Sequence, residues 1–247
     1  MQAFFVHTTP PCPGRLWRIE TDPGGTGLAA EVRDPESKSL DFYYIDFALS
    51  QPAWRKTATP ASWWHGLLGL RQDLLLYHGY EGPDWPVKKG VFAVDVVSAA
   101  PAWEQPELRP RRLEGNAILC QGEKPGQDFW VDCRSGEPTL SPDYSIAVRH
   151  RTPVAANAPQ IHFWVRRFGK STHLQVLIFN EVAAMAALTE QGPHIAFFHH
   201  EDTLFDAALD PELCKPGSPF FYEENGKFIW IEPGMKISWA IVQGRST

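Results

Sequence analysis

The chain has 247 residues and a net charge of −6, with 43% hydrophobic and 21% charged residues. This composition is typical of a folded globular protein and excludes a largely disordered chain. The acidic balance argues against binding of duplex nucleic acid, because duplex binders usually carry a basic face.

The chain is rich in aromatic residues (13%), in Pro (22) and in Gly (19), which favours many short strands joined by sharp turns. No run of 18 apolar residues is present, so we expect no membrane span. The first twenty residues lack a signal-peptide pattern, and the four Cys lack zinc-binding spacing. These features predict a cytoplasmic protein with reduced thiols.

A repeated pattern organises the chain. In three segments an Asp follows an apolar run, a Pro comes six residues later, and a large apolar residue comes eight residues later. The three sets are Asp46, Pro52 and Trp54; Asp95, Pro101 and Trp103; and Asp132, Pro138 and Leu140. Two weaker copies place Asn180 and Glu232 in the Asp position. The resulting spacing of 37 to 52 residues is close to that of β-propeller blades.

The repeat predicts five units of four strands. In chain order, the expected strands are 16–19, 28–33, 41–47 and 53–56; 64–70, 74–80, 90–96 and 102–104; 111–113, 117–122, 129–133 and 139–141; 144–149, 161–168, 173–179 and 184–188; and 195–199, 220–223, 227–231 and 237–242. We therefore predict an all-β protein, a five-bladed β-propeller of antiparallel strands, as one domain over residues 1–247. The alternative folds are a β-sandwich or an incomplete barrel built from the same hairpins. Residues 180–192 and 202–214 could instead form short helices, which would not change the fold class.

Each repeated position has a structural role in this fold. The Asp can accept hydrogen bonds from the backbone of the turn after the third strand. The Pro can begin an outer strand, where a missing N–H faces solvent. The large apolar residue can pack between neighbouring sheets. These positions are therefore expected to be structural and not catalytic.

Residues 43–54 and 91–103, YYIDFALSQPAW and VFAVDVVSAAPAW, resemble the propeller repeat of quinoproteins. That resemblance implies the fold, and we predict no quinone or other cofactor. The stretches LAAEVRD, SLDFYYIDF, WWHGLLGLRQDLLLYHGY and KKGVFAVDVVS also resemble an uncharacterised bacterial family of domains of unknown function. This second resemblance implies no activity and no catalytic residues.

Two segments supply candidate ligand-binding residues. We interpret residues 79–90, GYEGPDWPVKKG, as a long polar loop that places an aromatic side chain among charges, which suits a sugar or peptide ligand. Its candidates are Tyr80, Asp84, Trp85 and Lys88, with His78 at its base. The alternative is an ordinary surface loop with Trp85 packed on a neighbour.

The second segment, Ser62–Gly66, has the sequence SWWHG. Trp63, Trp64 and His65 could face a channel mouth and stack on a planar ring or a sugar. The alternatives are that Trp64 is a wedge between blades and that His65 is a structural, hydrogen-bonded histidine.

The sequence carries no HEXXH, GxSxG, Walker A or GxGxxG motif. The run FFHHED, residues 197–202, places adjacent His on opposite faces of a strand, so we predict no metal site. The function that we predict is a non-catalytic module that binds an unidentified protein or small ligand at one face, with neither nucleic acid nor membrane as a partner. The alternative is a metal-assisted hydrolase or sugar-acting enzyme at the central channel mouth, with Glu31, Asp84, Glu114 and Asn116 as candidates.

Overall fold

The protein is represented by a computed structural model that describes residues 3–49, 54–57, 62–82, 85–122, 124, 126–142, 172–179, 182–189, 192–199, 202–211, 221–224, 227–233 and 235–243. Twenty β-strands and no helix are found in these ranges. The chain divides into two compact units, unit 1 with residues 1–12 and 150–247, and unit 2 with residues 13–149.

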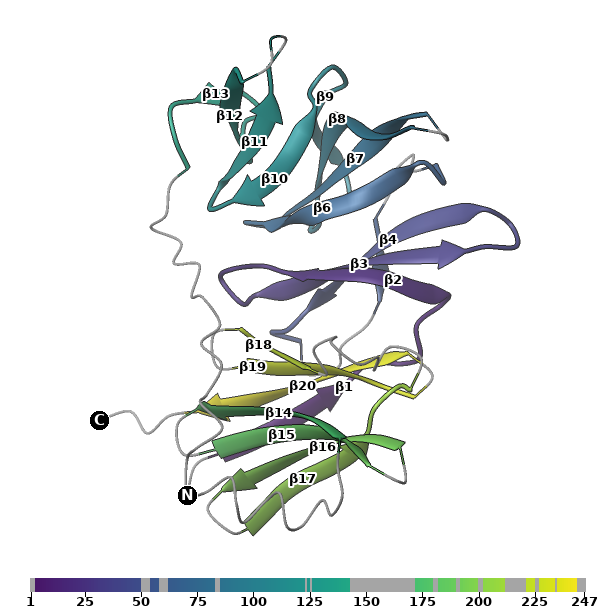
Figure 1. Ribbon diagram of the computed structural model, residues 1–247, viewed down its shortest axis with the longest axis vertical. Coiled ribbons are helices and arrows are strands. Elements are labelled where there is room, and N and C mark those ends of the chain that lie inside the picture. Colours follow the sequence, from purple (N-terminus) through teal and green to yellow (C-terminus); the bar gives the residue numbers. More distant parts are fainter. Residues whose placement is uncertain are drawn as a thin grey trace. The chain divides into compact units, whose positions relative to one another are not determined.

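Unit 2 contains three four-stranded antiparallel sheets (Figure 1). Sheet 1 is formed by β2 (Arg15–Thr21), β3 (Gly27–Asp34), β4 (Ser39–Asp46) and β5 (Arg55–Lys56). Sheet 2 is formed by β6 (His65–Arg71), β7 (Leu74–Gly82), β8 (Trp85–Asp95) and β9 (Pro101–Gln105). Sheet 3 is formed by β10 (Pro110–Glu114), β11 (Ala117–Gln121), β12 (Asp128–Asp132) and β13 (Pro138–Thr139).

Unit 1 contains two further sheets of the same kind. Sheet 4 is formed by β14 (Thr172–Phe179), β15 (Val182–Thr189), β16 (Gly192–His199) and β17 (Asp202–Ala208). Sheet 5 is formed by β18 (Phe221–Glu224), β19 (Lys227–Glu232) and β20 (Lys236–Gln243), and β1 (Ala3–Thr8) pairs with β20 as its fourth strand.

This topology confirms the predicted fold class. Each of the five described sheets has four antiparallel strands, and in sheets 1 to 4 these follow one another along the chain, which is the construction of a propeller blade. The last sheet takes its outer strand from the N-terminus of the chain. The expectation of one domain over residues 1–247 stays a prediction.

Apolar side chains pack between successive sheets within each unit. In unit 2, one core cluster joins sheet 1 to sheet 2 through residues such as Phe42, Leu67 and Tyr77. A second joins sheet 2 to sheet 3 through residues such as Leu76 and Ile118. Sheet 2 lies between these two clusters, so β7 is buried on both faces, which explains its nearly continuous apolar sequence.

The three strong repeats behave as predicted at the turn after the third strand. Asp95 Oδ1 accepts hydrogen bonds from the backbone N–H groups of Val97 and Ser98 and from the Ser98 hydroxyl. Asp132 accepts the equivalent three bonds from Arg134 and Ser135. The bonds with Ser98 hold the pKa of Asp95 below its usual value. These carboxylates are therefore turn caps.

The apolar position of the repeat is confirmed in one copy and wrong in another. Trp103 packs on the cluster between sheets 2 and 3, and its Nε1 donates to the Cys133 carbonyl at 3.0 Å. Gly136 lies directly under this ring with φ +74°, where a Cβ would come within 2.8 Å of the indole. Leu140, by contrast, is fully exposed, because sheet 3 ends its outer strand at Thr139.

The predicted strand order of the last two units is wrong. The segments expected as third and fourth strands of unit four are β14 and β15, the first and second strands of sheet 4, and 195–199 belongs to its third strand, β16. Residues 182–187 are all buried. Their apolar sequence resembled the fourth strand of the repeat, although they form the second strand of sheet 4. The predicted strands 144–149 and 161–168 lie outside the described residues. The helices considered over 180–192 and 202–214 are excluded where β15 and β17 form.

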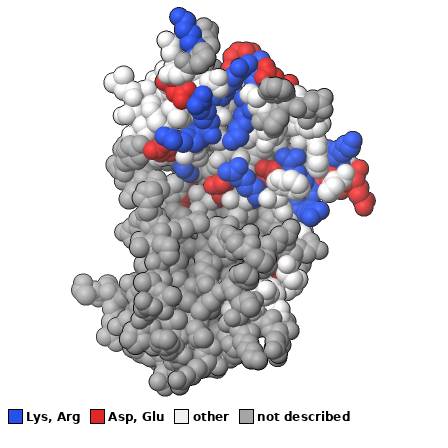
Figure 2. Space-filling model, in the orientation of Figure 1, with Lys and Arg blue, Asp and Glu red and all other residues white. Residues whose placement is uncertain are grey.

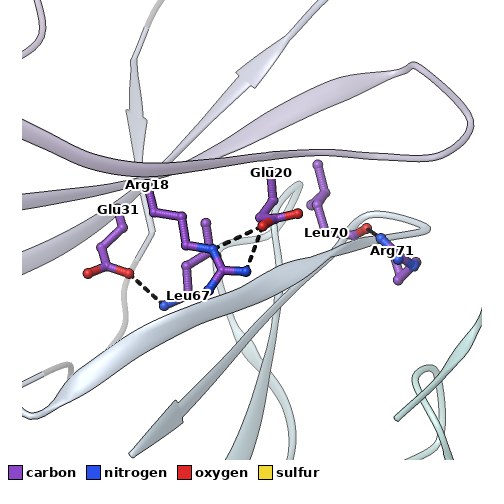
Figure 3. Close-up of polar contacts among 6 residues, drawn as sticks. All are labelled: Arg18, Glu20, Glu31, Leu67, Leu70 and Arg71. Carbon is purple, nitrogen blue, oxygen red and sulfur yellow. Dashed lines mark hydrogen bonds and ion pairs between the residues drawn. The ribbon is translucent and has the colours of Figure 1, made fainter. Parts of the chain in front are cut away.

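A buried ion pair joins sheet 1 to sheet 2. Arg33 Nε lies 2.6 Å from Glu31 Oε1, and the two side chains are 8% and 3% exposed. Glu31 Oε2 accepts from the Leu67 N–H at 2.8 Å (Figure 3). Arg33 donates to the carbonyls of Trp63 and His65 at 2.8 and 2.6 Å. Two side chains of β3 thus bind the backbone at the start of β6.

We predict that Arg33→Met lowers the free energy of unfolding by about 3–5 kcal/mol, because it leaves the buried Glu31 carboxylate without its partner. Arg15→Met is the matched control, since Arg15 is exposed and lies opposite Arg33 on β2; its effect should stay within about 0.5 kcal/mol. Urea unfolding followed by circular dichroism measures both. Equal, small losses in the two variants would contradict the role given to Arg33.

Candidate functional site

The segment before β6 is held in place on both sides. His65 N–H donates to the Ser62 carbonyl at 3.0 Å, and the Ser62 N–H donates to His65 Nδ1 at 2.8 Å. Arg33, on β3 of sheet 1, donates hydrogen bonds to the carbonyls of Trp63 and His65. These contacts fix the backbone from which the side chains of Trp63, Trp64 and His65 project.

Strand pairing assigns the predicted residues to two faces of sheet 2. Gly66 lies opposite His78, and Tyr80 lies opposite Lys88. The Tyr80 N–H donates to the Trp64 carbonyl at 2.9 Å, which continues the β6–β7 pairing to Trp64. Directly opposite residues share a face. We call the set Trp64, Gly66, His78, Tyr80 and Lys88 the Trp64 face.

The other face is a closed aromatic cluster against sheet 1. The Arg33 guanidinium lies 4.9 Å from the Trp63 ring and 5.3 Å from the Trp17 ring. The His65 ring meets the rings of Tyr77 and Phe92 edge-on at 5.5 and 5.6 Å. Burial lowers the pKa of His65. This arrangement favours the structural interpretation of Trp63 and His65.

Trp64 is not a wedge between blades. Its side chain is 46% exposed, while Trp103 takes the packed position between sheets 2 and 3. Of the two Trp in SWWHG, Trp64 is therefore the one that is open to a ligand.

His78 is a buried, neutral histidine below the Trp64 face. It is 1% exposed, its Nδ1 lies 3.0 Å from the Gly79 carbonyl, and its ring meets Tyr80 edge-on at 4.9 Å. Burial lowers the pKa of His78 to about 4, and the nearby charges of Lys88 and Arg18 act in the same direction. A Cβ at Gly66 would come within 3.2 Å of His78 Nε2, so glycine leaves room for the imidazole.

Lys88 differs from the other cations of unit 2. It is partly buried, and within the described residues its ammonium makes neither an ion pair nor a hydrogen bond. Burial lowers the pKa of Lys88, and the charge of Arg18 lowers it further. The other described cations of this unit that lack such a partner are all exposed: Arg15, Lys38, Arg55, Lys124 and Arg134.

Arg18 is the residue near this site that the sequence interpretation missed. It lies on β2 of sheet 1, and Figure 3 shows its side chain extending toward β6 with Glu20 beside it. Arg18 Nε and Nη2 both donate to Glu20 Oε1, at 2.9 and 2.7 Å. Its sequence context, RLWRIE, gave no signal, because β2 approaches β6 only through the packing of sheet 1 on sheet 2.

The predicted long loop over residues 79–90 is wrong. β7 continues to Gly82 and β8 begins at Trp85, so most of this segment is a hairpin. Bulges after His78 and after Tyr80 allow the pairing to continue through residues that are typical of turns. Asp84 lies outside the described residues, and Trp85 is described only as the first residue of β8.

Cationic side chains gather on the described part of the face shown in Figure 2, with acidic side chains among them. Ion pairs join many of the cations of unit 2 to acids, including Lys89 with Glu107 and Arg109 with Glu81, both at 3.3 Å. Such exposed pairs contribute little stability. They do neutralise the charges around Lys88.

The described side chains considered for a hydrolase site each bind a different partner. Glu31 pairs with Arg33, Glu114 pairs with Arg112 at 2.8 Å, and the Asn116 amide lies 3.3 Å from Asp132. Among the residues that the structure describes, no group of three or more His, Cys, Asp or Glu side chains could hold a metal ion. No helix long and apolar enough to cross a membrane occurs in these ranges either.

Stability should depend on pH through His78, whose pKa falls on folding from about 6.5 to about 4. Between these values the unfolded chain binds more protons, so stability is complete above pH 6.5 and declines toward pH 4. We predict that urea unfolding shows a smaller loss between pH 7 and pH 5 in His78→Gln than in the unsubstituted protein. An identical loss in both would show that His78 does not carry this dependence.

Comparisons with solved structures give weak likenesses. BamB from Moraxella catarrhalis is 9% identical with a TM-score of 0.32, covering 93% of this chain and 83% of that one. A protein described as exported, from Bacteroides fragilis, is 7% identical with a TM-score of 0.39, covering 98% and 95%. The β-propeller domain of the trilobed protease from Pyrococcus furiosus is 12% identical with a TM-score of 0.30, covering 87% and 64%. The fold assignment rests on the sheet topology described above.

No curated protein matches the chain. Residues 21–103 match a family described as a domain of unknown function, DUF4905. This segment includes most of sheet 1 and nearly all of sheet 2. It also contains every stretch on which the resemblance to a domain of unknown function was based, so that resemblance is confirmed over residues 21–103.

Proposed function

We propose that the chain is a non-catalytic propeller module that binds a small ligand, or an exposed group of a protein partner, at the Trp64 face. The observation that carries this proposal is a row of three residues. Trp64 immediately precedes β6, Tyr80 pairs with it from β7, and Lys88 lies opposite Tyr80 on β8. The row combines an exposed indole, a phenol and a partly buried ammonium without an ion-pair partner in the described structure.

Each member of the row supplies a different kind of contact. The exposed indole of Trp64 offers a flat surface for stacking on a ring. The Tyr80 hydroxyl can donate and accept hydrogen bonds, and the Lys88 ammonium can donate up to three. An aromatic platform beside a few polar groups is the usual composition of a small-molecule site. A single exposed Trp would carry no such meaning.

The backbone supports the idea of a preformed site. Trp64 is fixed by the contacts of Ser62, His65 and Arg33 on one side and by its pairing with Tyr80 on the other. Tyr80 and Lys88 lie within a paired hairpin. Side chains on such elements lose little freedom when a ligand binds, which favours affinity.

The test is a thermal-shift screen of sugars, sugar acids and small aromatic compounds, followed by isothermal titration of every compound that stabilises the protein. We predict that at least one such compound binds about tenfold more weakly to Trp64→Ala, through lost stacking. Trp17→Ala is the matched control, since Trp17 is 58% exposed in the same unit but lies against Arg33. Binding that is insensitive to Trp64→Ala, or equally sensitive to both, would contradict the proposal.

A further inference from the structure

We infer that the Trp64 face selects a ligand that carries a single oxyanion, a carboxylate or a phosphate, on a sugar-like ring. The inference rests on the proposed function and specifies its ligand. The anion would lie against Lys88, and the ring would stack on Trp64.

The first argument is the balance of charge around Lys88. The acids whose ion pairs lie on the neighbouring strands and loops are each matched by another cation: Glu20 by Arg18, Glu81 by Arg109 and Glu107 by Lys89. His78 is neutral near pH 7 and adds no charge. Within the described residues, Lys88 is thus the partly buried cation that is left without an anion. A partly desolvated cation beside a like charge is costly, and an anionic ligand relieves that cost.

The second argument is the position of Lys88. It lies within the paired β7–β8 hairpin, directly opposite Tyr80. Directly opposite residues share a face, so an oxyanion held by Lys88 lies on the same face as Tyr80.

The third argument concerns size. Trp64 immediately precedes β6, and Lys88 lies on β8, so β7 runs between them. Neighbouring strands are about 4.8 Å apart. The two backbones are therefore separated by about 10 Å, with Tyr80 between them. Long side chains at both ends shorten this span, so one ring with a charged substituent can touch both.

The surroundings restrict the ligand to one charge. Glu20, Glu81 and Glu107 already have cationic partners, so within the described residues Lys88 is the partly buried cation that lacks an anion. A ligand with a single oxyanion matches that one charge. The acidic charge of the whole chain disfavours a polyanion such as a nucleic acid.

The experiment is isothermal titration of the full chain with three probes of similar size, namely glucuronic acid, glucose 6-phosphate and methyl glucoside. We expect at least one of the two acids to bind about tenfold or more tightly than the neutral sugar. Preference for glucuronic acid would assign a carboxylate site, and preference for glucose 6-phosphate a phosphate site.

The variants separate charge from folding. Lys88→Met keeps the aliphatic stem and removes the charge, and it should reduce the preference for the acid to about threefold or less. Lys88→Arg should retain the preference. Lys56→Met is the matched control, because Lys56 pairs with Asp41 at the outer strand β5, and it should change nothing.

Three results would overturn the inference. If the neutral sugar binds as tightly as both acids, or if Lys88→Met keeps the preference, the oxyanion site is wrong while a binding face at Trp64 stands. If none of the three probes binds, the inference fails for this ligand class, and the proposed function is then judged separately by the Trp64→Ala screen.

Discussion

The arrangement of the site depends on the buried contact between Arg33 and Glu31. Two charged side chains on one strand of sheet 1 bind three backbone groups at the start of sheet 2. Buried charges are tolerated only when they are paired and hydrogen-bonded. Besides their bond to each other, Arg33 binds the carbonyls of Trp63 and His65, and Glu31 binds the N–H of Leu67. One interaction therefore joins two sheets and positions the candidate ligand-binding row.

The opposite faces of sheet 2 illustrate how one segment can be structural and functional at once. Trp63 and His65 close an aromatic cluster around Arg33, while Trp64 is exposed on the other side. Trp63 and Trp64 lie in the turn that leads into β6, and the bond from the Tyr80 N–H to the Trp64 carbonyl continues the β6–β7 pairing to Trp64. The closed face holds the backbone. The open face carries a polar row whose ammonium, on Lys88, has no anionic partner in the part of the chain that the structure describes.

Sequence reasoning predicted the sheets where the repeat had a physical cause. The Asp95 and Asp132 turn caps and the packed Trp103 are local requirements of a blade. The repeat therefore predicted nearly every strand of unit 2. It failed in sheets 4 and 5, where an apolar run imitated the repeat and where β1 pairs with β20 from the other end of the chain. For the site, Trp64, His78, Tyr80 and Lys88 were predicted, but Arg18 was not, because its proximity arises from sheet stacking. Location in the cytoplasm and the absence of a cofactor stay predictions.

The measurement that tests the central claim most directly is an NMR titration of the protein with its lysines ¹³C-methylated, with the Lys88 signal assigned from Lys88→Arg. The account predicts that the pKa of Lys88 is below the usual value of a lysine ammonium, because the side chain is partly buried, and that glucuronic acid or glucose 6-phosphate moves its signal selectively. A Lys88 that titrates at the usual value and does not respond to either acid would contradict an anion site at the Trp64 face.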